Sequence, residues 1–146
     1  MFKFEKMIAW QKGVDLVDQA FGISDNWPQR YQFSLGEQLR RAALSITNNL
    51  AEGSGRISPG HRRNFYDSAK GSVYEVVSIL TIANKRNLVD REVLNRLYQH
   101  ADELASIISG LIESTLREEN TPRTLRDDTT DYDASDTLHS NSNSPL

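Results

Sequence analysis

The chain has 146 residues, of which 38% are hydrophobic and 25% charged, a composition typical of a soluble protein that folds as one domain. It contains no cysteine, which excludes disulfides, thiolate metal sites and cysteine nucleophiles, and no apolar run approaches the ~20 residues needed to span a bilayer. The net charge of −3 is unevenly distributed, because residues 117–146 hold seven acidic residues against three arginines and therefore carry −4.

The first periodic segment begins near Phe4 and ends at Gly22. Gly13 inside it costs roughly 1 kcal/mol relative to alanine, unless a neighbouring helix packs closely against it. The loop that follows contains Trp27, which we expect to cap one end of the core and not to serve as a stacking platform for a cofactor or base. Apolar side chains at alternating steps of three and four residues predict one buried helical stripe: Met7, Trp10, Val14, Val17 and Phe21.

The second helix is expected to start at Ser34, with Glu37 three residues later completing a capping box. Gly53 and Gly55 are expected to end it, because glycine tolerates the left-handed geometry of a C-cap. A glycine-rich phosphate loop is excluded, since such a loop follows a strand and precedes a helix. The predicted apolar face of this helix is Leu35, Leu39, Ala42, Ala43, Ile46 and Leu50.

Ser58 and Pro59 have the residue types that open a helix, and residues 85–87 close it with two cations suited to the negative end of the helix dipole. Gly71, in the middle of this third helix, predicts a close contact between helices. The expected apolar positions are Phe65, Ala69, Ser72, Val76, Ile79 or Leu80, and Ala83.

A fourth helix is expected to start after Asp90 and to run to Arg117. Its heptad-like apolar run is Val93, Leu97, Ala101, Leu104, Ile108, Leu111 and Thr115. Residues 119–146 are rich in Asp, Ser and Thr and cannot bury enough apolar surface to fold, so we expect a disordered acidic tail. The sequence thus predicts an all-α protein: an up-down-up-down antiparallel four-helix bundle in residues 1–118, followed by the tail.

Positive charge is concentrated in the middle of the chain. Residues 30–70 contain seven basic and three acidic residues, a surplus of +4. A phosphate-contacting surface would release condensed counterions, so its affinity for nucleic acid would fall steeply with salt. The predicted nucleic-acid-binding residues are Arg40, Arg41, Arg56, Arg62, Arg63 and Lys70.

A structural alternative exists for the adjacent pair Arg40 and Arg41, which point about 100° apart on a helix. One of them is expected to form an ion pair with Glu75 or Glu52. Asn49 beside the apolar stripe is expected to bond across helices or subunits, and we predict a structural polar cluster of Asn49, Glu52 and Glu75.

Four aromatic residues flank the basic positions and are expected mainly in the core or in a subunit interface, with stacking on unpaired bases as the alternative: Phe33, Phe65, Tyr66 and Tyr74.

Nothing in the sequence favours an enzyme or a cofactor. The three histidines lack ligand-spaced partners, and the Glu-x-x-His pairs of di-metal bundles are missing. There is no P-loop and no nucleophile elbow. The first six residues lack the apolar region of a secretory signal, so the expected compartment is the cytoplasm.

The region from Phe4 to Thr115 resembles a known family, the small four-helix-bundle proteins encoded in intervening sequences of bacterial 23S ribosomal RNA genes. These in turn resemble the accessory variability proteins of diversity-generating retroelements. The matching positions are Phe4-Glu5-Lys6, Trp10, Trp27-Pro28, Gln38-Leu39-Arg40-Arg41-Ala42-Ala43, Ser45-Ile46, Asn49, Ala51-Glu52-Gly53, Gly71-Ser72 and Glu75.

The resemblance implies a homopentamer arranged as a barrel, with a role associated with nucleic acid and, in the retroelement relatives, partnership with a reverse transcriptase. Our leading hypothesis is therefore a cytoplasmic, non-enzymatic homo-oligomer whose basic face binds nucleic acid, RNA in preference to DNA, or a nucleic-acid-processing protein. The alternative is a protein-interaction scaffold without direct nucleic-acid contact. The acidic tail is expected to compete with nucleic acid for the basic face.

Overall fold

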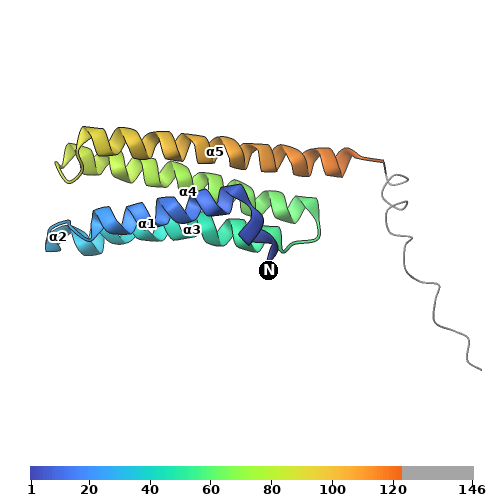
Figure 1. Ribbon diagram of the computed structural model, residues 1–146, viewed down its shortest axis with the longest axis horizontal. Helices are drawn as coiled ribbons and strands as arrows, with labels where there is room; N and C mark the ends of the chain where they lie inside the picture. Colours follow the sequence, from blue (N-terminus) through green and yellow to red (C-terminus); the bar gives the residue numbers. More distant parts are fainter. Residues whose placement is uncertain (123–146) are drawn as a thin grey trace, which may run out of the picture.

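The computed structural model describes residues 1–122, and these residues are helical with no β-strand (Figure 1). Four long helices account for most of them: α1 (Ile8–Ser24), α3 (Glu37–Ser54), α4 (Pro59–Lys85) and α5 (Arg91–Asn120). Three short elements complete the list: η1 (Lys3–Lys6), α2 (Gln29–Tyr31) and η2 (Gln32–Gly36). None of the helices in this described part is long and apolar enough to cross a membrane.

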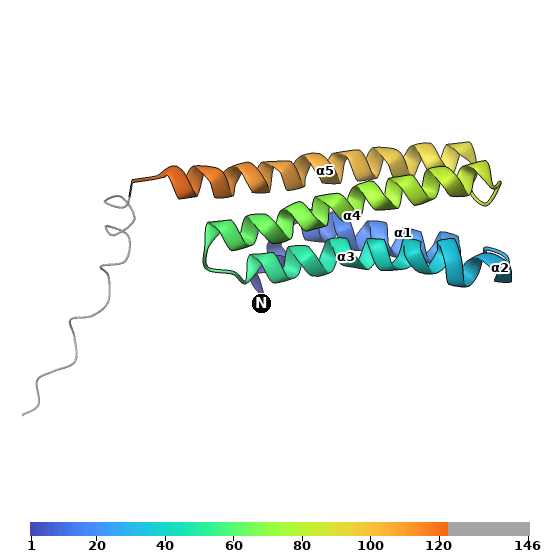
Figure 2. The same cartoon turned by 180° about the vertical axis from the view of Figure 1, so that it is seen from behind.

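Successive long helices run in opposite directions, an arrangement consistent with the expected up-down-up-down topology (Figures 1 and 2). The packing order is cyclic: α1 packs against α3 and α5, and α4 packs against the other sides of α3 and α5. Helix α5 and the turn between α3 and α4 extend beyond the start of α1 (Figure 1). One end of the bundle is therefore built from three helices.

The buried face of α1 differs from the predicted stripe. Val14 is 38% exposed, and the other four predicted residues are only partly buried. A Cβ added to Gly13 would lie 3.1 Å from Thr47 Cγ2, so the small residues let α1 approach α3 closely. This close approach decides which face turns inward. The buried residues of α1 are Ala9, Gly13, Leu16, Ala20 and Ser24.

The start and end of α3 also differ from the prediction. Ser34 lies in the π-helical turn η2 and its hydroxyl donates to Arg30 O and Tyr31 O, so the expected capping box with Glu37 is wrong. The helix passes through Gly53, where an added Cβ would lie 2.8 Å from Tyr66 Cε1. Gly53 is thus required for close packing against α4 and not for a cap. Gly55 is the C-cap, as expected, but its φ of −85° is not the left-handed geometry that was predicted. The predicted apolar face is correct, with all of its residues buried except the half-buried Leu35.

The expected ends of α4 are confirmed. Ser58 is the N-cap and accepts a hydrogen bond from His61 N at 3.3 Å, with Pro59 in the first turn. After the last turn Asn87 adopts a positive φ of 57°, a left-handed position that asparagine tolerates. The prediction for Gly71 is wrong within this chain, because an added Cβ there would meet nothing within 4 Å.

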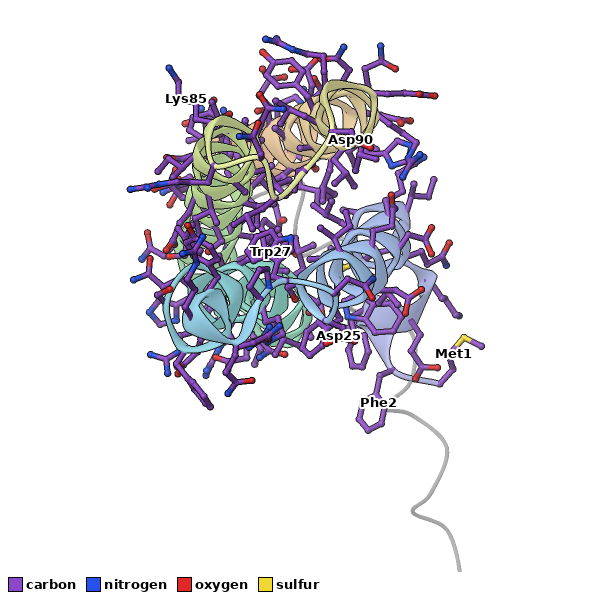
Figure 3. All side chains as sticks on the ribbon, turned by 90° about the vertical axis from the view of Figure 1, so that its left-hand side faces the viewer. Met1, Phe2, Asp25, Trp27, Lys85 and Asp90 are labelled. Carbon is purple, nitrogen blue, oxygen red and sulfur yellow. The ribbon has the colours of Figure 1, made fainter. Side chains whose placement is uncertain are left out.

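Trp27 closes the end of the bundle where the α1–α3 and α4–α5 connections meet. Its side chain is 6% exposed and points in among the helices, whereas Met1 and Phe2 lie at the periphery (Figure 3). The indole Nε1 donates to Leu88 O at 3.1 Å, so the buried polar atom is satisfied. The expected capping role is confirmed.

Helix α5 begins after Asp90 as expected, although the Asp90 side chain makes no capping hydrogen bond. It ends at Asn120, so Glu119 and Asn120 are helical, contrary to the expected start of the tail at residue 119. Thr121 is the C-cap of α5, and residues 123–146 of the predicted disordered tail lie outside the described residues. The buried positions are Leu94, Leu97, Ala101, Leu104, Ala105, Ile108 and Thr115, largely as the heptad-like run predicts.

Candidate nucleic-acid interface

The six predicted basic residues do not form one continuous surface. Arg40 and Arg41 lie in the first turns of α3, whereas Arg56 follows its end, 16 residues later and therefore about 24 Å away along the axis. Arg62 and Arg63 lie in the first turns of α4, near Arg56. The remaining residue, Lys70, lies farther along α4.

Arg40 is built into the end of the bundle. Its Nη1 donates to Ser24 Oγ at 3.0 Å and to Gln32 Oε1 at 3.3 Å, and its Nη2 donates to Gln32 O at 3.0 Å. The half-buried guanidinium thus joins the last residue of α1 to the π-helical turn before α3. These hydrogen bonds engage both terminal nitrogens of Arg40 within the fold.

Arg41 is exposed on the outer surface of α3. Its Nη2 lies 2.7 Å from Glu37 Oε1, an ion pair one helical turn away. The expected pairing of Arg40 or Arg41 with Glu75 or Glu52 is wrong, because the helical spacing to Glu37 satisfies Arg41 locally. An open groove on this surface is lined by Arg41, Leu44, Ser45, Asn48, Asn49 and Glu52.

The turn between α3 and α4 gathers three arginines. Arg56 is exposed, and its guanidinium carbon lies 5.0 Å from the centre of the Phe65 ring. Arg62 donates from Nη1 to two carbonyls of the turn, Arg56 O at 3.1 Å and Ile57 O at 2.6 Å. A cation stacked on an aromatic ring is the kind of surface on which single-strand binders hold nucleic acid.

Both α4 arginines contact the end of α5. Arg62 Nη2 forms an ion pair with Glu118, and Arg63 Nη1 lies 2.8 Å from Glu119 Oε2. Neither glutamate is among the site residues predicted from the sequence. A contact between residues 56 positions apart depends on how α4 and α5 are aligned, which no local pattern encodes.

The predicted polar cluster is only partly present. Asn49 Nδ2 donates to Ser45 O at 2.8 Å and Ser45 Oγ at 3.0 Å, within α3. The link between helices is Ser72 Oγ to Ser45 Oγ, at 2.9 Å. Glu52 and Glu75 are exposed and lie outside this cluster. Their longer carboxylate side chains extend into solvent, whereas the shorter serine side chains pack between the helices.

The four flanking aromatics fall into different environments. Tyr66 is buried, with 5% exposure, and Phe65 is half-buried under Arg56. Phe33 is 79% exposed and Tyr74 is 62% exposed, with Lys70 Nζ lying 5.9 Å from the Tyr74 ring centre. Of these four aromatic residues, only Tyr66 thus belongs to the hydrophobic core.

Tyr66 is also electrostatically perturbed by its surroundings. Burial raises the pKa of its phenol, the nearby Arg62 lowers this pKa, and Glu118 raises it. Tyr66 therefore lies close enough to the Arg62–Glu118 ion pair to report on it.

A second charged region lies between α1 and α5 and carries acidic residues. A groove there is lined by Lys12, Asp15, Asp18, Gln19, His100 and Glu103, with Lys12 Nζ 3.0 Å from Glu103 Oε1. Among the described residues, no group of three or more histidine or carboxylate side chains has an arrangement that could hold a metal ion.

Comparison with known protein families assigns the chain to one of them. The chain matches the family described as 23S rRNA-intervening sequence protein over residues 5–110. The chain belongs to this family. A comparison with individual curated proteins found no match.

The matched range contains all six predicted basic residues. Glu118 and Glu119 lie beyond it, so the carboxylates that contact Arg62 and Arg63 come from a part of the chain outside the match.

Proposed function

We propose that this family member is a non-enzymatic, cytoplasmic homo-oligomer, an up-down-up-down bundle that binds nucleic acid, RNA in preference to DNA. The observation that carries the proposal is the Arg56–Phe65 pair beside Arg62 and Arg63. It combines an exposed cation, an aromatic face and further arginines at one end of the molecule. Phosphates contact such cations, and unpaired bases stack on such rings.

Exposed Arg41 on α3 and half-buried Lys70 on α4 are separate cations that add to the proposed contacts. Arg40 is removed from the predicted set because its donors are engaged by Ser24 and Gln32. A monomer presents only a modest positive surplus. A closed ring, with five copies proposed from the family resemblance, would repeat the surface around the assembly and strengthen its field.

Salt titration tests the proposal. The logarithm of the affinity for a short single-stranded RNA should fall linearly with the logarithm of the salt concentration. The Arg56→Gln and Lys70→Gln variants should each reduce the slope by about one. Arg86→Gln is the matched control, since Arg86 is an exposed cation at the other end of α4. A wild-type slope near zero would remove the phosphate-contact proposal.

A protein-interaction scaffold is the second candidate, and one observation favours it. A small groove between α4 and α5 is lined mainly by apolar and aromatic residues, including Val73, Tyr74, Tyr98 and Ala105. Tyr74 and Tyr98 are 62% and 55% exposed, an arrangement that suits a side chain of a protein partner. A reverse transcriptase is the proposed partner class. Salt-independent binding of such a partner, without RNA affinity, would favour this alternative.

A further inference from the structure

The Arg62 guanidinium is held in position by the turn itself. Its Nη1 donates to Arg56 O and Ile57 O, while its Nη2 points to the Glu118 carboxylate. Loss of the carboxylate would leave both carbonyl contacts in place. The guanidinium is therefore preorganised to receive another anion at the same position.

The two sides of these ion pairs differ in exposure. The side chains of Arg62 and Arg63 are 18% and 27% exposed, whereas those of Glu118 and Glu119 are 50% and 47% exposed. The arginines belong to the body of the bundle, and the carboxylates approach from its solvent side. Departure of the carboxylates would uncover the arginines without opening the core.

The last turn of α5 is lightly attached to the bundle. Thr115 is 3% exposed, but residues 116–120 are all exposed. This turn also lies at the end of the bundle that α1 does not reach (Figure 2). Terminal turns with little buried surface open at low free-energy cost, so the carboxylates can be displaced locally.

We propose that Glu118 and Glu119 occupy a phosphate-receiving site on Arg62 and Arg63, so that the last turn of α5 competes with nucleic acid for these arginines. Phosphate and carboxylate present similar oxygen pairs to a guanidinium. The neighbouring Arg56–Phe65 pair favours a nucleic-acid phosphodiester over a free phosphate ion, since it supplies a stacking surface for a base. This inference rests on the proposed function and adds its regulation.

The test compares full-length variants by fluorescence anisotropy with a labelled single-stranded RNA at fixed salt. Glu118→Gln with Glu119→Gln should bind about fivefold more tightly than a charge-matched control, because two exposed competing ion pairs are removed. The control is Asp102→Asn with Glu113→Gln, which removes two exposed α5 carboxylates that lie outside the ion pairs. Circular dichroism verifies that both variants keep the helical fold.

A double-mutant cycle separates local competition from a change in net charge. The glutamate substitutions should give no gain in RNA affinity when they are added to an Arg62→Gln, Arg63→Gln variant, compared with that arginine variant alone, because the donors that they would uncover are gone. Free inorganic phosphate at millimolar concentration should not displace the RNA from the glutamate variant. Displacement would show that the site binds free phosphate as well, and would contradict the proposal that its ligand is a nucleic acid.

Two further outcomes would contradict the inference in different ways. Equal affinity of the glutamate variant and its control, with wild-type binding still salt-dependent, would overturn the competition and leave the proposed function standing. Absence of salt-dependent RNA binding in every variant would overturn both.

Discussion

Arg40 in α3 donates from Nη1 to Ser24 Oγ, 3.0 Å away, in the last turn of α1. Ser24 is completely buried, and the same guanidinium also binds the carbonyl of Gln32. The adjacent Arg41 faces solvent with 78% of its side chain exposed. Two neighbouring arginines of one sequence motif thus have different roles, one closing the fold and the other available to a ligand.

Arg40→Lys should lower the free energy of unfolding by about 1–3 kcal/mol, because an ammonium cannot reproduce the forked contacts to Ser24 and Gln32. Arg41→Lys is the matched control and should cost less than about 0.5 kcal/mol, since its ion pair with Glu37 is exposed. Urea unfolding followed by circular dichroism measures both. Equal midpoints for the two variants would contradict the structural role of Arg40.

Gly53→Ala should destabilise the protein by about 1–3 kcal/mol, because the added methyl would lie 2.8 Å from Tyr66 Cε1 and 2.9 Å from Phe65 Cβ. Gly71→Ala is the control within another helix. Its methyl would meet nothing within 4 Å, so better helix propensity should stabilise the chain by up to about 1 kcal/mol. Thermal unfolding should therefore shift in opposite directions, and a shared direction would contradict the packing argument.

The sequence predicted the fold best where large apolar residues occupy a single helical face. In α3 and α5, Leu39, Ile46, Leu97 and Ile108 are fully buried as expected. The prediction was only partly correct in α1, where Met7, Trp10 and Val17 pack against the core but the fully buried face consists mainly of smaller residues. Periodicity favours the larger residues, but the Gly13–Thr47 contact turns the smaller ones inward.

The candidate site was less predictable because it depends on long-range alignment. Basic residues were visible in the sequence, yet their partners Glu118 and Glu119 lie 56 positions away. Arg40 reaches Gln32 because of the π-helical turn η2. The sequence did not predict this turn, since the spacing of Ser34 and Glu37 indicated a capping box instead. Side-chain pairing across elements needs the helix register, and composition does not supply it.

Tyr66 gives a pH-dependent prediction. Its pKa in the folded protein is raised above 10.0, first by burial. The folded chain therefore keeps its proton while the unfolded chain loses it, so this stability is present below pH ~10 and is lost as pH rises through the folded pKa. Tyr66→Phe should reduce the loss of stability above pH ~10 in urea unfolding. An unchanged decline would contradict the buried phenol as its cause.

The same phenol reports on the contact between α4 and α5. Glu118 raises the pKa of Tyr66, so Glu118→Gln should lower this pKa, whereas Glu113→Gln should leave it unchanged. Tyrosinate absorbance, with the Tyr66→Phe spectrum subtracted, isolates this group. If both variants titrate like the wild type, the last turn of α5 does not hold Glu118 near Arg62 in solution.

Self-association gives the final prediction, because the proposed field of a ring requires several copies. Leu44 is 41% exposed on the outer surface of α3, where a large apolar side chain is suited to a contact between protomers. The wild type should have a solution mass about five times the 16.5 kDa of one chain, the number implied by the family resemblance. Leu44→Asp should reduce that mass. The control is Asn48→Asp, which adds the same charge one turn away at a position that is already polar and exposed, and it should leave the mass unchanged. A wild-type mass of one chain would refute the ring, and an unchanged mass for Leu44→Asp would exclude this face as the contact between copies.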